Sequence, residues 1–309
     1  MGTPLVSEEF RRLLDLRLRG VSDDRMKYNE LNGMIPKLFN EITSNSAYDE
    51  FMSVTGVPDI PAFSGQMTTL SMSSGWTKKL ESKEYAAQII AQRKLVDDNK
   101  YGVLKDFAAG LMDSFYRVRE KKAVNVFNNA ASVAFDFMTS EENKPLASTT
   151  HLTKMDGVST TSGFSNYGTN ALNETNLASA RISMRQYRTD IGERFQGGNN
   201  YALIVPDDLE FKALEITQTK SGLYSGEGTE NVHRGRYEVI VYSRMSDSSA
   251  TAWALVDKDL MKKDLLFVNR TAPESQRTFD FSSKALMQSI YGRFACGFLD
   301  WRWIYFNAP

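Results

Sequence analysis

The side chains best suited to catalysis or metal binding are few and lie far apart in the sequence. There are two histidines, His151 and His233, both in polar, loop-like segments. A Ser/His/Asp triad would also need a nucleophilic serine, but no nucleophile-elbow pattern occurs; the nearest string, Gly222–Gly226, has its serine in the wrong place. No zinc-protease, P-loop or dinucleotide-binding motif is present. We therefore predict a protein without catalytic, cofactor-binding or metal-binding residues. A hydrolase that uses His151 or His233 is the alternative from the enzyme class.

The acidic pairs and the cysteine have simpler explanations than chemistry. Glu141 and Glu142 are adjacent in sequence, which points their side chains apart. Asp207 and Asp208 suit the N-terminal end of a helix, where the helix dipole favours negative charge. Cys296 is the one cysteine of the chain, so no internal disulfide can form. Because it stands among aromatic residues, we expect a buried thiol that packs as a small hydrophobic side chain.

Composition predicts a globular protein that does not grip nucleic acid. The chain has 309 residues, of which 41% are hydrophobic and 24% charged, enough for a large core. Its net charge of −1 provides no basic field for DNA binding, although a protein that merely encloses DNA is compatible with that value. No apolar run reaches the roughly 18 residues of a membrane span, and no signal peptide is evident, so we expect a soluble, intracellular product without a membrane partner.

Two long segments have the texture of projecting arms. Residues 7–19 read as a charged helix that Gly20 ends, with a narrow apolar stripe that includes Phe10 and Leu14 and has little to bury against in its own chain. Residues 56–83 are rich in Gly, Pro, Ser and Thr, too long for an ordinary connection, and alternate as an extended two-stranded arm would. A flexible loop is the alternative for this second segment.

Basic residues gather on the second arm and at a glycine-rich loop, residues 219–235. Each group is either a solvated charged face or a set of ion-pairing contacts between subunits. The residues that we predict to contact a neighbouring subunit come from both arms and from this loop: Trp76, Lys78, Lys79, Lys83, Arg234, Arg236, Phe10 and Leu14.

The remaining elements predict a long helix and a compact α/β lobe. Residues 98–130 carry Leu104, Ala108 and Leu111 at helical spacing, which indicates a helix of roughly 45–50 Å. A turn-rich stretch, 139–172, separates it from the lobe. The lobe contains two helices, one at 173–191 that Gly192 ends and one at 206–216 that Pro206 opens. Its three strands lie at 201–205, 237–243 and 252–256. Residues 279–306 are strongly strand-like.

Taken in order, several strings resemble the major capsid proteins of tailed bacteriophages, in particular the Mu-type major head subunits. No single string is diagnostic, but their order along the chain is similar to that of the family. The strings are Pro145–His151, Ala171–Ala180, Leu203–Leu209, Trp253–Asp257, Asn269–Glu274 and Tyr291–Arg302.

The resemblance implies an α+β protein of the Hong Kong 97-type capsid fold, with an N-terminal arm, an extended loop, a peripheral domain built on a long spine helix, and an α/β axial domain. Mapped onto this sequence, the domains would be an N-terminal arm at 1–55, an extended loop at 56–83, the peripheral domain at 84–135 with 262–309, and the axial domain at 136–261.

The resemblance also implies a structural role. Copies would assemble as hexamers and pentamers into an icosahedral shell around double-stranded DNA, in a virion made in the bacterial cytoplasm. Few residues precede the extended segment, so a scaffolding protein would be a separate partner, beside a portal and a decoration protein. Some relatives join a lysine to an asparagine of another subunit, for which Lys78, Lys79 and Lys83 are candidates by position. A nanocompartment shell of the same fold and a tail or baseplate protein are the structural alternatives.

Overall fold

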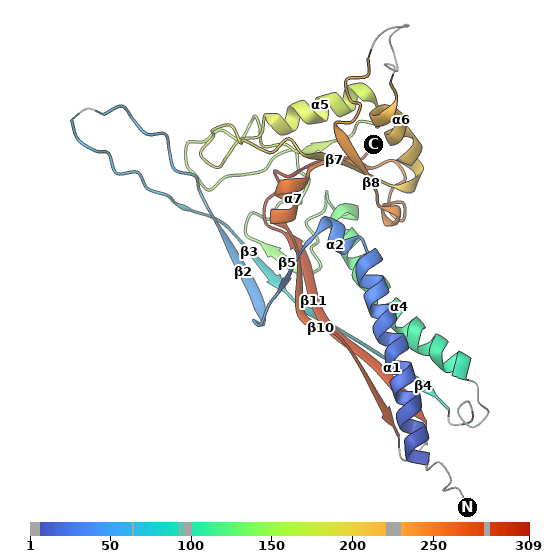
Figure 1. Cartoon of the computed structure of the whole chain (residues 1–309). Coiled ribbons are helices and arrows are strands. Elements are labelled where there is room, and N and C mark those ends of the chain that lie inside the picture. Colours follow the sequence, from blue (N-terminus) through green and yellow to red (C-terminus); the bar gives the residue numbers. More distant parts are fainter. Residues whose placement is uncertain (1–6, 64, 93, 95–100, 221–229, 281–284) are drawn as a thin grey trace, which may run out of the picture.

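The computed structural model describes residues 7–63, 65–92, 94, 101–220, 230–280 and 285–309. Figure 1 shows a compact lobe that contains the C-terminus, a long strand-and-helix body that runs away from it, and a hairpin that projects to one side. Helices and strands are both abundant, as an α+β protein requires. In the described part of the chain, no helix combines the length and apolar character needed to cross a membrane.

The first helix, α1 (Ser7–Asn32), continues through Gly20, so the predicted end at that residue is wrong. A glycine inside a helix costs about 1 kcal/mol relative to alanine. Contacts with a second helix, α4 (Tyr101–Asn128), offset this cost. Arg25 pairs with Asp113 at 2.6 Å, Asn29 donates to the same carboxylate at 2.7 Å, and the Tyr116 hydroxyl donates to Glu30 at 2.6 Å. The local signal at Gly20 thus predicts an end of the helix, but contacts with α4 allow the helix to continue to Asn32.

The body is a four-stranded sheet covered on one face by α4. Its strand order is β1-β10-β11-β4. The first strand, β1 (Asn40–Thr43), is parallel to β10 (Leu265–Phe279). The next, β11 (Leu286–Phe298), is antiparallel both to β10 and to β4 (Lys83–Ala91). The short helix α2 (Ile35–Leu38) leads into β1. Phe115 of α4 packs edge-on against Phe294 of β11, with ring centroids 6.3 Å apart. The predicted spine helix is therefore present and lies on this sheet.

Close contact between α4 and the sheet depends on Gly292 of β11. A Cβ atom at this position would lie 2.6 Å from the Phe115 ring. We expect Gly292→Ala to destabilise the chain by about 1–3 kcal/mol, because the rigid ring must shift within a packed core. The matched control is Gly110→Ala in α4, where nothing lies within 4 Å; it should raise stability by up to ~1 kcal/mol. Urea unfolding of both variants checks the pair, and a neutral Gly292→Ala contradicts the close-packing argument.

The compact lobe is built on a five-stranded sheet of order β6-β12-β9-β7-β8. The strands β7 (Tyr201–Val205) and β9 (Trp253–Asp257) are buried along their whole length, as a central position predicts. The other strands are β6 (Tyr167–Gly168), β8 (Tyr237–Val241) and β12 (Ile304–Asn307). The helices of the lobe are α5 (Glu174–Arg185), η1 (Asp207–Leu209), α6 (Glu210–Gln218), η2 (Ser243–Met245) and α7 (Lys258–Asp264).

Two features of this lobe differ from the predictions. We grouped residues 262–309 with the body, but β12 pairs with β9 and β6 and completes the sheet of the lobe. Trp303, which is fully buried, lies just before β12, where the chain passes from the body to the lobe. The helix predicted to reach Gly192 ends at Arg185. Tyr187, two residues further on, is buried, and its hydroxyl donates to the carbonyl of Ile304 at 2.9 Å. Its ring therefore packs against the sheet of the lobe outside a helix.

The projecting hairpin is formed by β2 (Tyr48–Val54) and β3 (Ser74–Glu81), which pair antiparallel; β5 (Met138–Ser140) adds a third strand at the base. We call residues 48–81 the arm and residues 55–73 its tip. The two-stranded arm predicted within 56–83 is present, but its first strand lies upstream of that range.

The core of the body and lobe is one large cluster of buried hydrophobic residues. A second, small cluster of Leu18, Ala91, Leu104, Ala108 and Leu286 lies between α1, α4 and the far end of the sheet.

Candidate functional site: the arm and its joint with the body

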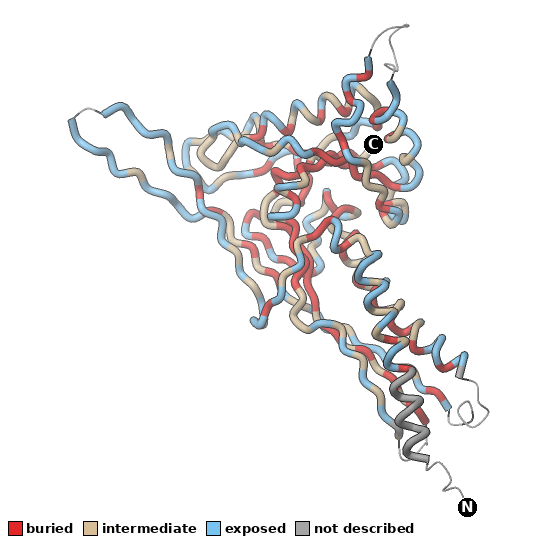
Figure 2. Tube along the Cα trace, viewed as in Figure 1, coloured by how far each residue is buried: buried red, intermediate tan, exposed pale blue. Residues whose placement is uncertain are grey.

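The arm exposes an unusual number of large apolar side chains. Met67 is 91% exposed, Ile60 86% and Phe63 76%. Figure 2 shows mostly exposed chain along the projecting tip. The set also includes Met52, Val54, Val57 and Met72. Exposed apolar side chains that gather on one segment mark a surface that another molecule covers.

Trp76 attaches the base of the arm to its own chain. We call this contact region the joint; its residues are Trp76, Lys78, Glu141, Glu142, His151 and Lys154. Its indole nitrogen donates to the carbonyl of Leu152 at 3.1 Å, and the ammonium of Lys154 lies 5.1 Å from the ring centroid. Glu141 binds Lys154 at 2.6 Å and accepts from the backbone nitrogen of Thr77 at 3.0 Å. Trp76 therefore helps to fix the direction of the arm, and its contact with a neighbouring subunit stays a prediction.

Lys78 is also committed to its own chain, which corrects its prediction as a contact residue. Its side chain is buried, with the ammonium 4.3 Å from the ring centroid of Phe298. Burial lowers the pKa of Lys78, and the nearby carboxylates of Asp300, Glu142 and Asp264 oppose this shift. The surroundings of Lys78 thus indicate a role within the subunit.

The other predicted contact residues have varied positions. Lys79 is half-buried with its ammonium 4.0 Å from the ring centroid of Tyr48, and Lys83 is exposed, 5.4 Å from that of Phe137. Arg234 and Arg236 are exposed beside residues 221–229 of the glycine-rich loop, which lie outside the described residues. Phe10 and Leu14 belong to α1, but their side chains fall outside the described part. For these residues, contact with a neighbour stays a prediction.

His151 is a structural residue of the joint. Its ring is buried and stacks on Trp301 with centroids 4.2 Å apart. One ring nitrogen lies 3.0 Å from Glu142 and the other 3.1 Å from Asn166. Although burial alone would raise the pKa of Glu142, the bond from His151 lowers it. Both nitrogens are thus engaged within the chain, which leaves neither of them for a substrate.

His233, the other candidate of the hydrolase alternative, is also buried, and burial lowers its pKa. It lies in the turn before β8, and Tyr237 is its aromatic neighbour, with centroids 5.7 Å apart. Within the described ranges, no group of three His, Cys, Asp or Glu side chains could hold a metal ion. The two histidines therefore lie in different settings and do not form one site.

A charged cluster lines a cavity of about 540 Å³ under the arm, between β2, α7 and the turn before β12. Arg302 pairs with Asp300 at 2.9 Å and with Asp190 at 2.8 Å, and donates to the carbonyl of Arg188 at 2.7 Å. Burial, with a smaller contribution from Asp300, raises the pKa of Asp264 to about 6. Residues of β2 and α7 line the same cavity, so the cluster lies where the lobe, the body and the arm meet.

The raised pKa of Asp264 predicts a pH-dependent stability. A carboxyl group whose folded pKa is raised binds a proton more tightly in the folded state, so its charge destabilises the fold above pH 6 and this penalty disappears as pH falls toward 4. We expect Asp264→Asn to gain about 1–2 kcal/mol at pH 8, allowing for partial solvent screening, and to match the parent chain near pH 4.5. Urea unfolding at both pH values is the measurement. A variant that is less stable at pH 8 would show that the charge is needed.

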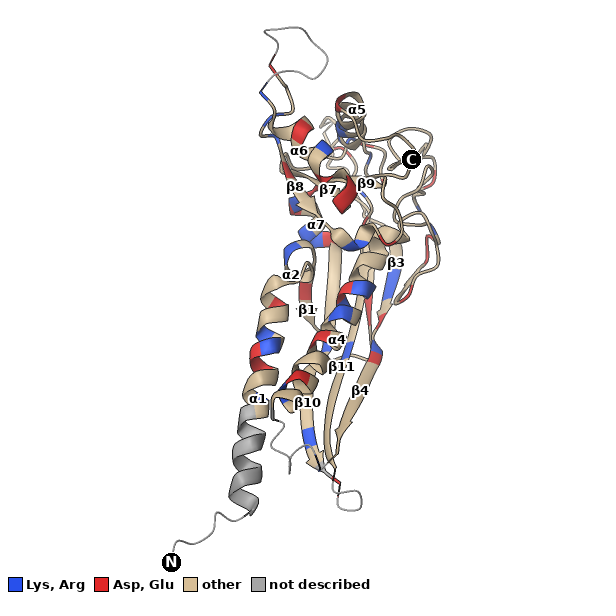
Figure 3. Cartoon of the chain, turned by 90° about the vertical axis from the view of Figure 1, so that its right-hand side faces the viewer, with Lys and Arg blue, Asp and Glu red and all other residues tan. Residues whose placement is uncertain are grey.

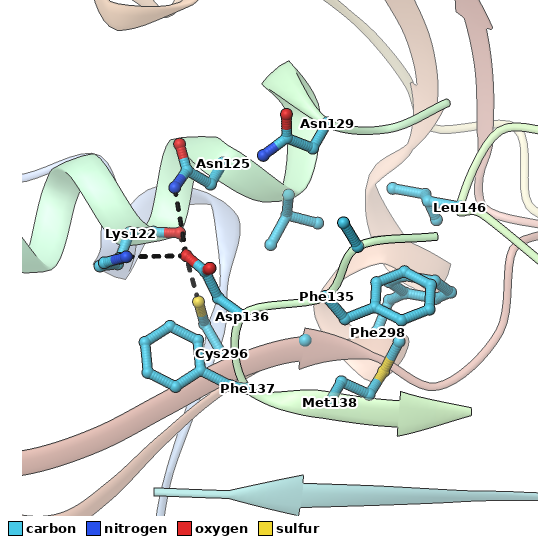
Figure 4. Close-up of a pocket in the computed structure, with 13 residues that line it drawn as sticks. Lys122, Asn125, Asn129, Phe135, Asp136, Phe137, Met138, Leu146, Cys296 and Phe298 are labelled. Carbon is cyan, nitrogen blue, oxygen red and sulfur yellow. Dashed lines mark hydrogen bonds and ion pairs between the residues drawn. The ribbon is translucent and has the colours of Figure 1, made fainter. Parts of the chain in front are cut away.

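Cys296 lines a small pocket between α4, the segment before β5, and β11 (Figure 4). The cavity volume is about 40 Å³, room for water but not for a substrate. At its edge Asp136 accepts from Lys122 at 2.8 Å and from Asn125 at 3.3 Å. The thiol donates to the carbonyl of Lys122 at 3.4 Å, and burial raises its pKa. The prediction of a buried thiol is confirmed.

The family model described as "Phage capsid protein" matches residues 77–307, about three quarters of the chain. No curated protein sequence matches the chain.

Solved structures are similar over most of their length. A structure from Microbacterium phage Oxtober96 has a TM-score of 0.55 at 10% identity, covering 90% of this chain and 91% of that one. The mature capsid of bacteriophage PhiM1 gives 0.55 at 11% identity, with 90% and 87% covered. The capsid of Ralstonia phage GP4 gives 0.54 at 13% identity, with 87% and 86% covered.

At these identities the structural similarity shows the fold, and the predicted Hong Kong 97-type capsid fold is confirmed. The family model matches well over half of the sequence, including the lobe and most of the body, but does not separate a Mu-type subfamily. The chain belongs to the phage capsid protein family.

Proposed function

We propose that this chain is a major capsid subunit that assembles as hexamers and pentamers into an icosahedral shell around double-stranded DNA. It would form the shell of a virion after synthesis in the host bacterial cytoplasm. The observation that carries the proposal is the arm, whose Ile60, Phe63 and Met67 project from the body with their apolar side chains exposed. Such a segment gains its stabilisation from a second copy, because its own body does not cover it.

The domains would follow the division expected for the fold, with an N-terminal arm at 1–55, an extended loop at 56–83, a peripheral domain formed by 84–135 and 262–303, and an axial domain at 136–261. We add residues 304–309 to the axial domain because β12 completes its sheet. Arg234 and Arg236, at the exposed end of the lobe, would contact neighbours around the capsomer axis. Rings would form by head-to-tail contacts that close on rotation.

The contents and partners follow from charge and from the resemblance of the sequence to Mu-type head proteins. A net charge of −1 suits a container that encloses DNA without sequence-specific binding. A separate scaffolding protein, a portal and a decoration protein would complete the particle. The role is structural, and both histidines are buried within the chain.

A nanocompartment shell that holds enzyme cargo is the second candidate. The observation that favours it is the similarity to a virus-like particle from Pyrococcus furiosus, with a TM-score of 0.51 at 8% identity and 94% and 97% of the two chains covered. The two candidates differ in contents and in gene neighbourhood. Terminase and portal genes beside this one support a phage, and an adjacent cargo enzyme supports a nanocompartment.

Negative-stain electron microscopy with sedimentation of the purified chain tests the proposal. Closed shells, or rings of several hundred kilodaltons, are the expected result. A chain that stays a monomer near its mass of 34.9 kDa, even with salt, crowding agents and a co-expressed scaffolding protein, contradicts it.

A further inference from the structure

We propose that the cavity under the arm binds a small zwitterion with an apolar side chain, the chemistry of an aliphatic amino acid. The site belongs to the single subunit, so it does not depend on assembly. The cavity has a volume of about 540 Å³, within the ~300–1,000 Å³ of pockets that hold small molecules. Its lining includes the exposed residues Glu50, Met52 and Lys263, so it opens to solvent and a ligand can enter.

The cavity contains a buried positive charge without a hydrogen-bond partner. Lys78 of β3 lines it and is only 4% exposed. Its ammonium lies 4.3 Å from the ring centroid of Phe298, and within the described part of the chain no carboxylate lies at ion-pair distance from it. A buried charge without a partner is costly, and contact with an aromatic ring offsets only part of that cost. A ligand carboxylate that accepts from this ammonium would supply the missing partner.

One half-buried carboxyl group of the cavity is left for the ammonium of a ligand. Three other carboxylates of the lining are already engaged, by Arg302 or by His151; they are Asp190, Asp300 and Glu142. Asp264, the last residue of α7, has neither a hydrogen bond nor an ion pair through its carboxyl group among the residues that the structure describes. Burial raises its pKa to about 6, so it is mostly charged at neutral pH. An ammonium beside it would stabilise that charge.

Apolar side chains make up much of the remaining lining. Phe51 and Val54 come from β2, and Leu299 directly follows β11. Phe51 and Leu299 are half-buried, and Val54 is 55% exposed, so none of the three is fully covered by its own chain. An aliphatic group of the ligand would cover these side chains and remove apolar surface from water.

A ligand with charge of one sign fits this cavity less well. The carboxylates of the lining would repel a simple anion, and Lys78 and Arg302 would repel a simple amine. Figure 3 shows basic and acidic residues interspersed on the side of the molecule that it faces, so no broad field there favours one sign. A zwitterion would pair with Lys78 and with Asp264 and add no net charge to the cavity.

Isothermal titration calorimetry of the purified chain with L-leucine tests the site. L-leucine carries both charges and an aliphatic side chain, and two analogues each lack one charge: isoamylamine has no carboxylate, and isocaproate has no ammonium. We expect saturable binding of L-leucine, with a Kd for either analogue that is higher by about tenfold or more, because each analogue loses one charge-assisted hydrogen bond.

Two substitutions assign the charges, with circular dichroism to verify folding. In Lys78→Met, L-leucine should bind no better than isoamylamine, and in Asp264→Asn no better than isocaproate, because each variant lacks the group that distinguishes the two compounds. The matched control is Lys79→Met, whose ammonium lies against Tyr48 outside the cavity; it should keep the parent Kd. The proposal is overturned if L-leucine does not bind the parent chain, if the three compounds bind equally, or if both folded variants keep the parent Kd.

Discussion

Replacing residues 56–72 with an Asn-Gly turn should abolish shell assembly and leave the subunit folded. Thr55 and Ser73 already bind each other across the hairpin, with the Thr55 nitrogen donating to the Ser73 carbonyl at 2.9 Å. A two-residue turn of this type joins antiparallel strands at that point. None of the described residues from 56 to 72 is buried, so the free energy of unfolding should change by less than about 1 kcal/mol.

Electron microscopy and sedimentation measure assembly, and urea unfolding measures the subunit. The matched control is Thr68→Ser with Thr69→Ser, which keeps the length of the tip and its apolar side chains and should assemble normally. Normal shells from the shortened arm would remove the arm from assembly. Loss of folding would instead mean that the tip supports its own chain.

Arg302→Met should destabilise the subunit by about 2–4 kcal/mol at pH 7. The arginine is 8% exposed and holds Asp300 and Asp190, and its removal leaves two carboxylates without their partner. Removing one member of a buried pair costs up to about 5 kcal/mol. The lower range applies here because the Asp300 side chain remains 30% exposed. Methionine keeps much of the apolar stem, so the loss reports mainly on charge.

This loss should depend on pH. Burial alone would raise the pKa of Asp300, but the charge of Arg302 lowers it. A carboxyl group with a lowered pKa stabilises the fold above its unfolded value near pH 4, and the contribution disappears as pH falls through the folded pKa. The difference between parent and variant should therefore be largest at neutral pH and shrink below about pH 4. Urea unfolding across this range is the measurement. The control is Arg234→Met, an exposed arginine, which should change stability by less than about 0.5 kcal/mol.

Features that depend on neighbouring residues could be predicted from the sequence. The apolar run Tyr201–Val205 is a buried strand, and the helix opened by Pro206 follows it. Leu104, Ala108 and Leu111 are all buried on one side of the long helix. Cys296 is buried, as its aromatic surroundings indicated. Each of these patterns repeats over a few residues, which is the range over which helical and strand periodicity is expressed.

The candidate site was predicted only in part. The arm was recognisable because its length and its Gly, Pro, Ser and Thr content do not suit an ordinary connection. The roles of Trp76 and Lys78 within their own chain could not be predicted. The alternating pattern that contains these residues is the same whether the strand is exposed or covered at its base by a loop from a distant part of the sequence.

By itself, the sequence determined the arm, the long helix and the absence of any recognisable catalytic motif, because local periodicity, turn residues and residue chemistry are sufficient for these. The fold class came from the resemblance of several strings to phage capsid proteins. The tertiary structure alone decided that α1 continues past Gly20, that β12 joins the sheet of the lobe, and that Lys78 is buried beneath the arm. All three depend on contacts between residues far apart in the chain, such as the pairing of β12 with β6. Such pairings are selected by the packing of the whole molecule, where burial of apolar surface outweighs a local preference of about 1 kcal/mol.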